Sequence, residues 1–158
     1  MNTLIIYATR HGCTEKCALK IKDMLQGQTD LFKLKNRSVD ISNYDTIIIG
    51  GSIHMGQIQK QVKNLILRNG DLLKNKKVGL FLCCMENGET AATQFNNAFP
   101  EELRNFASAT GLFGGEFNLD KMNFIEKFIT QKIAKVEKSI SRISEENIKT
   151  FVNQFVNS

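Results

Sequence analysis

Two threonines and a glycine near the N-terminus could together bind an anion: Thr9, Gly12 and Thr14. The apolar residues 3–8 predict a strand that leads into this turn, and a helix is expected to begin directly after it. The first N–H groups of a helix have no partner within it and carry partial positive charge. With the two hydroxyls they could hold a phosphate group, while Arg10 and His11 add charge from outside.

Two common phosphate-binding motifs do not occur in this turn. It has neither the Gly-x-Gly-x-x-Gly fingerprint of a dinucleotide site nor the Gly-Lys-Ser/Thr ending of a nucleoside triphosphate loop. The pattern that remains is Thr-x-x-Gly-x-Thr. Ordinary turn and helix-capping chemistry is the alternative interpretation of the two threonines.

Two later segments repeat the order of an apolar run followed by a polar turn that contains glycine. The first spans residues 43–56 and the second spans residues 77–88. Each apolar run predicts a buried strand, and we expect each strand to end in a flexible loop. In an open parallel sheet the carboxyl ends of the strands lie at one edge, where ligands bind at the change in strand order. The three turns are therefore expected to form one site.

The whole chain alternates expected strands with expected helices, which predicts an α/β parallel sheet covered on both faces. A second strand is expected at residues 30–36 and a fifth near residues 111–117. At 158 residues, with no repeat or linker, residues 1–158 are expected to form a single domain. Helices are expected before Gly27, at residues 59–69, 91–99 and 101–107, and after the capping residue Ser144.

Composition excludes several classes of protein. The chain is 42% hydrophobic with one proline, which argues against disorder, and no apolar stretch approaches the ~20 residues of a membrane span. Met1 leads directly into a strand without a signal peptide, so we expect a cytoplasmic protein. The four cysteines are interpreted as small core residues, with a reactive thiol at Cys13 as the alternative. Their spacing and that of the histidines match no zinc motif, so no metal site is expected.

Residues 121–142 carry six basic residues against two acidic ones, in a chain of net charge +5. We interpret this segment as one amphipathic helix whose apolar stripe packs on the protein's own core. The alternative is a helix that lies on an anionic membrane surface. Nucleic-acid binding is not expected, because charge is its only support. The stripe would consist of Met122, Ile125, Ile129, Ile133, Val136 and Ile140.

The sequence resembles the flavodoxins, and among them the branch that includes the menaquinone-dependent protoporphyrinogen dehydrogenases. The resemblance rests on Ala-Thr-Arg-His-Gly-Cys-Thr at residues 8–14, Asn-Tyr-Asp at residues 43–45 and Gly-Gly-Ser-Ile-His-Met-Gly at residues 50–56. It covers nearly the whole chain. It implies a flavodoxin-like three-layer sandwich with a five-stranded parallel sheet of order 2-1-3-4-5, helices on both faces and an extra helix-rich segment after strand five.

The resemblance also implies flavin mononucleotide (FMN) as the cofactor, with no catalytic residue supplied by the protein. Flavodoxins usually stack tryptophan or tyrosine on the flavin ring, but this chain has no tryptophan and neither tyrosine lies in the second or third loop. Met55, Met85 and His54 are the expected substitutes. The phosphate would be held by Thr9, Arg10, His11, Gly12, Cys13 and Thr14. The isoalloxazine would be contacted by Ser52, Ile53, His54, Met55 and Gly56 on one side and by Cys84, Met85, Glu86, Asn87 and Gly88 on the other.

The function that this resemblance implies is electron transfer between redox partner proteins, a reductase and an acceptor. Two alternatives stay open: a quinone-dependent protoporphyrinogen dehydrogenase, and a non-redox interaction module that uses the basic helix. A quinone or an anionic membrane surface would meet residues 121–142, which would place the protein at the inner membrane face. The net positive charge and His54 would favour an anionic reduced flavin.

Overall fold

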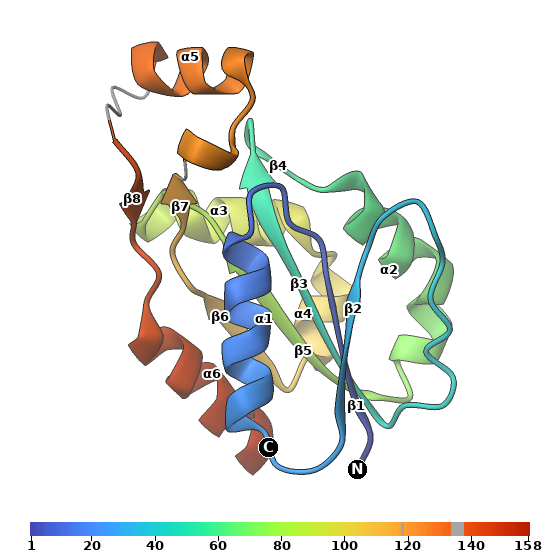
Figure 1. Cartoon of the computed structure of the whole chain (residues 1–158). Coiled ribbons are helices and arrows are strands. Elements are labelled where there is room, and N and C mark those ends of the chain that lie inside the picture. The colour runs from blue at the N-terminus through green and yellow to red at the C-terminus, as the bar shows by residue number, and fades with distance from the viewer. Residues whose placement is uncertain (118, 134–137) are drawn as a thin grey trace.

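The computed structural model describes residues 1–117, 119–133 and 138–158, and within them five parallel strands form the central sheet (Figure 1). These strands lie in the order β2-β1-β3-β5-β6. Apart from the short strand β4, this is the predicted order 2-1-3-4-5, so the predicted topology is confirmed. The strands are β1 (Thr3–Tyr7), β2 (Thr29–Lys33), β3 (Thr46–His54), β5 (Lys77–Cys83) and β6 (Ala109–Leu112).

Helices cover both faces of the sheet (Figure 1). α1 and α6 bury their apolar residues on one face, and α2, α3 and α4 bury theirs on the other. The interior strand β1 serves both cores, because Leu4 and Ile6 point to one face while Ile5 and Tyr7 point to the other. The helices are α1 (Cys13–Met24), α2 (Lys60–Leu73), α3 (Gly88–Ala98), α4 (Glu101–Phe106) and α6 (Glu145–Asn157).

The second glycine-containing segment differs from its prediction as a flexible loop. Gly50 and Gly51 lie inside β3, which continues to His54. Both glycines are needed because other side chains occupy the space of a Cβ atom. A Cβ on Gly50 would lie 2.0 Å from the Phe81 ring, and one on Gly51 would lie 2.6 Å from the Ile58 side chain. A short strand, β4 (Gln57–Ile58), then folds back antiparallel on β3.

β6 and the chain after it also differ from the sequence interpretation. The fifth parallel strand ends at Leu112, earlier than the predicted residues 111–117, because the chain turns at Gly114. The backbone dihedral φ of Gly114 is 78°, and a Cβ there would lie 1.9 Å from the carbonyl oxygen of Arg142. Only glycine permits this close approach of two chain segments. A second small sheet follows, in which β7 (Glu116–Phe117) pairs antiparallel with β8 (Ile140–Ser141).

The prediction of one helix over residues 121–142 is wrong. A 3-10 turn (Leu119–Lys121) is followed by α5 (Phe124–Ile133), and Ile140 lies in β8 rather than on a helix. Val136 lies outside the described residues. The apolar stripe does not pack on the core either, because the exposed fractions of Ile125 and Ile129 are 68% and 42%. In the described part of the chain, no helix has the length and apolar character needed to cross a membrane.

Replacing Gly50 with alanine should destabilise the protein by about 1 to 3 kcal/mol, because the new methyl group overlaps the fully buried Phe81 ring. Gly70→Ala is the matched control. Gly70 lies inside α2 with open space around its Cβ position, so this change should stabilise by about 0.5 to 1 kcal/mol. Urea unfolding of the two variants should give shifts of opposite sign. Equal shifts would contradict the tight packing of β3 on Phe81.

Candidate functional site

A pocket of about 360 Å³ lies at the carboxyl edge of the sheet, where β1, β3 and β5 end. Its walls also include the chain between β6 and the middle of α5. The carboxyl ends of the strands thus meet in one pocket, as their sequence pattern predicted. Ten of the expected site residues line it: Thr9, Arg10, His11, Cys13, Ser52, Ile53, His54, Met55, Cys84 and Met85.

Six expected site residues do not line this pocket. Gly12 and Thr14 lie at the start of α1 and are not among the lining residues. Gly56 is in the turn of the β3–β4 hairpin, away from the lining. The third predicted loop is shorter than expected, because α3 already begins at Gly88. Glu86, Asn87 and Gly88 are also outside the lining.

The turn between β1 and α1 is closed by its own hydrogen bond. The N–H of Gly12 donates to the hydroxyl of Thr9 across 2.9 Å. Gly12 has a φ of 96°, which favours glycine, and a Cβ there would lie 2.9 Å from Nζ of Lys121. The ammonium group of Lys121 therefore lies directly over the turn, although Lys121 is distant in the sequence.

Thr14 has a hydroxyl with no partner among the described residues, although the side chain is fully buried. A buried polar group without a hydrogen bond is costly, so its presence calls for an explanation. Thr14 lies in the first turn of α1, where the capping residue Gly12 offers no side chain to the helix N-terminus. The start of α1 thus combines a buried, unsatisfied hydroxyl with uncapped N–H groups, which suits an anionic ligand.

Glu126 of α5 connects this turn to the distal segment. Its carboxylate accepts from Nε of Arg10 at 2.5 Å and lies 3.0 Å from Nε2 of His11. Nδ1 of His11 lies 3.1 Å from the carbonyl oxygen of Lys121, so both ring nitrogens face oxygen acceptors. The guanidinium of Arg10 stabilises the charged carboxylate and lowers the pKa of Glu126 from 4.5 to about 2.

The β3–β4 hairpin forms another wall of the pocket. Its two turn residues, Met55 and Gly56, both have positive φ, 50° and 76°, as a tight two-residue hairpin requires. Ser52 is held by Gln59, whose side chain accepts from the Ser52 N–H at 2.9 Å and donates to its hydroxyl at 2.6 Å. The pKa of His54 lies below its usual value because of partial burial, and Arg10 lowers it further. This lowering works against the positive charge that the sequence interpretation placed at His54.

Sequence reasoning missed one whole wall of the pocket, which comes from the chain after β6. The strand expected near residues 111–117 and the helix expected over residues 121–142 did not predict that this part of the chain lies over the site. The signal that could have suggested it is the aromatic residue Phe117, since no tyrosine or tryptophan was available for a flavin ring. The missed lining residues of this wall are Gly115, Glu116, Phe117, Met122, Asn123, Ile125, Glu126, Ile129 and Thr130; Cys83 at the end of β5 was also missed.

A flavodoxin domain model matches residues 4–144, which is most of the chain. The chain therefore belongs to the flavodoxin domain family, and the resemblance to flavodoxins is confirmed at this level. The flavodoxin-like domain-containing protein BilS of Clostridioides difficile (strain CD3) is 32% identical over 84 residues. This match covers 51% of the chain and 46% of BilS, so the chain spans about half the length of this curated relative.

Solved flavodoxins share the fold over nearly the full length. The two-electron reduced flavodoxin of Megasphaera elsdenii is similar with a TM-score of 0.60 at 16% identity, and the alignment covers 99% of each chain. Oxidised flavodoxin 1 of Bacillus cereus has a TM-score of 0.57 at 17% identity, with 99% of this chain and 98% of that chain covered. These likenesses support the α/β flavodoxin-like fold.

The ion pair between Arg10 and Glu126 makes a prediction about pH. Its stabilisation is fully present above pH 4.5 and is lost as the pH falls through 4.5 toward 2, because the folded-state pKa is lowered. Arg10→Gln should return the pKa of Glu126 toward its ordinary value. NMR titration of the Glu126 side-chain carboxyl measures this change. The control is Arg104→Gln, since Arg104 pairs with Asn96 instead. If Arg10→Gln leaves the Glu126 titration unchanged, Arg10 is not its partner in solution.

Proposed function

We propose that the chain is a flavodoxin-type protein that binds FMN and carries electrons between redox partner proteins. The observation that carries the proposal is the buried, unsatisfied hydroxyl of Thr14 at the uncapped start of α1. A phosphate group supplies the acceptor that this hydroxyl and the first N–H groups of α1 lack. Family membership supports the same assignment, because it makes FMN the expected cofactor.

The phosphate group would be held by the turn from Thr9 to Thr14. Arg10 lines the pocket and the ammonium of Lys121 lies over Gly12, so positive charge surrounds this end of the site. These positive charges favour the binding of a dianion such as a phosphate group. The turn therefore supplies hydrogen-bond donors from the backbone and Thr14. Arg10 and Lys121 supply charge, and of these two only Arg10 was expected from the sequence.

The isoalloxazine ring would lie among apolar side chains of the pocket. Ile53 and Met55 come from the hairpin, Met85 follows β5, and Phe117 comes from β7. Phe117 is the aromatic side chain in this wall, and its flat ring suits stacking on a flavin. FMN, when bound, supplies one- and two-electron transfer, and the protein's part is to bind it, orient it and limit its contact with water.

A second candidate function follows from the exposed apolar face of α5. Phe124, Ile125 and Phe128 are 84%, 68% and 55% exposed, and Ile125 also lines the pocket. A face of this kind suits an apolar electron acceptor such as a quinone, or a membrane surface with anionic lipids. This favours a quinone-dependent protoporphyrinogen dehydrogenase as the alternative. In either case we propose that the protein acts in the cytoplasm.

Thr14→Val tests the cofactor site. Valine keeps the volume but removes the hydroxyl, so FMN affinity should fall roughly tenfold or more, as expected from about 1.5 to 3 kcal/mol for a hydrogen bond to a charged group. The stability of the apoprotein should not fall, because the hydroxyl has no partner among the described residues. Fluorescence titration with FMN and urea unfolding give the two readouts.

The matched control is Thr29→Val. Thr29 in β2 has a hydroxyl that is also buried and unsatisfied among the described residues, but it lies away from the pocket. Its replacement should leave FMN affinity unchanged. Equal affinities for the Thr14→Val variant and the unmodified protein would refute the phosphate assignment.

A direct assay separates the electron carrier from the dehydrogenase. The FMN-loaded protein should accept electrons from a flavodoxin reductase and pass them to a one-electron acceptor protein. With protoporphyrinogen and a quinone it should form no porphyrin above the rate seen with free FMN. Porphyrin formation is measured by its absorbance. Rapid formation that requires the quinone would favour the dehydrogenase over the electron carrier.

A further inference from the structure

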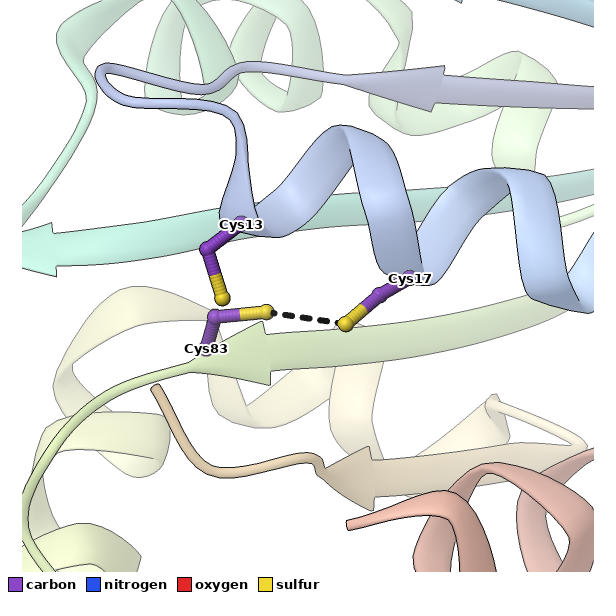
Figure 2. Close-up of side chains that lie close together, drawn as sticks. All are labelled: Cys13, Cys17 and Cys83. Atoms are coloured by element: carbon purple, nitrogen blue, oxygen red, sulfur yellow. Dashed lines mark hydrogen bonds between the residues drawn. The ribbon is translucent and has the colours of Figure 1, made fainter. Parts of the chain in front are cut away.

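Three cysteine thiols meet between α1 and β5 (Figure 2). Cys13 and Cys17 lie one helical turn apart on α1, and Cys83 is the last residue of β5. Sγ of Cys17 and Sγ of Cys83 are 3.6 Å apart, and the three sulfur atoms all lie within 4.8 Å of one another. All three are free thiols, so the cluster is not a disulfide.

The cluster is enclosed by the core. The exposed fractions of Cys17, Cys83 and Cys13 are 0%, 2% and 8%. Cys13 and Cys83 also line the pocket, which gives a small ion a path to the sulfurs. The three sulfurs thus form a dry site, reachable from one side, whose only ligand atoms in the described part of the chain are thiols.

We propose that Cys13, Cys17 and Cys83 form a binding site for a copper(I) ion with three sulfur ligands. An ion about 2.3 Å from each sulfur, the usual metal–thiolate distance, would keep the sulfurs roughly 4 Å apart. The observed spacing needs only small side-chain rotations to reach that geometry.

The ligand set selects copper(I) over other common ions. Thiolates are soft ligands that prefer copper(I) and zinc to magnesium, calcium or manganese. Structural zinc sites are almost always closed by four protein ligands, whereas this group supplies three thiols and no histidine or carboxylate among the described residues. Copper(I) has the lower coordination number of the two, so three sulfurs in a dry site suit it better. The site does not depend on FMN, and its test is independent of the flavin.

The test uses the full chain with its thiols reduced and oxygen excluded, both with and without FMN. Copper(I) is offered as its coloured bicinchoninate complex, and loss of colour reports transfer to the protein. The unmodified chain should take up one copper(I) ion. Cys17→Ser and Cys83→Ser should each lower copper(I) affinity at least ~100-fold. Loss of a group that only supports a metal ligand already costs up to about 100-fold, and these variants lose a ligand itself.

Cys84→Ser is the matched control, because Cys84 is a buried cysteine next to Cys83 that lies outside the cluster. It should keep the affinity of the unmodified chain. Urea unfolding verifies that each variant is folded, and Cys17→Ala and Cys83→Ala replace any serine variant that is not. X-ray absorption of the loaded protein should show three sulfur ligands. Failure of the reduced chain to take copper(I), equal uptake by all variants, or retention of zinc but not copper(I) would overturn the proposal.

Discussion

The burial of the central strands on both faces is the constraint on which the rest of the structure depends. Neither face of β1 and β3 is exposed to water, because consecutive residues of both strands are fully buried: Ile5, Ile6, Ile47, Ile48 and Ile49. Parallel strands of this kind must be joined by crossovers that cover the sheet, and helices serve that purpose here. Because of these crossovers, the carboxyl ends of the parallel strands all lie at one edge of the sheet. The pocket follows from this geometry.

Local patterns explain what could be predicted. Apolar runs identified the strands, and Ser144 identified the start of α6, where its hydroxyl accepts the N–H of Asn147 at 3.1 Å. Gly50 and Gly51 misled because glycine in a sequence suggests a loop, whereas here it makes room for the Phe81 ring and Ile58. The need for glycine at these two positions arises from packing between distant segments, so the residues next to them in the sequence do not indicate it. The same holds for the early end of β6 at Leu112.

The site was predictable where strand ends define it and unpredictable where distant segments meet. Thr9 and Cys84 follow β1 and β5, Ser52 lies near the end of β3, and all three line the pocket. Glu126 lies 116 residues after Arg10, so no spacing pattern could suggest their ion pair. The amphipathic pattern of the tail suggested packing on the core. In the structure α5 instead lies beside the pocket with its apolar residues exposed, because β7 and β8 hold its two flanks together.

The carboxylate of Glu126 has a consequence for ligand choice. It pairs with Arg10 and lies beside the His11 ring, so the charge of Arg10 is already partly balanced, while the ammonium of Lys121 still lies over the turn. A small inorganic anion that enters must compete with this resident carboxylate for Arg10. A larger ligand that adds apolar contact with Phe117 and Ile53 has a second source of binding energy. If FMN binds here as proposed, this difference would favour the cofactor over free phosphate without any steric barrier.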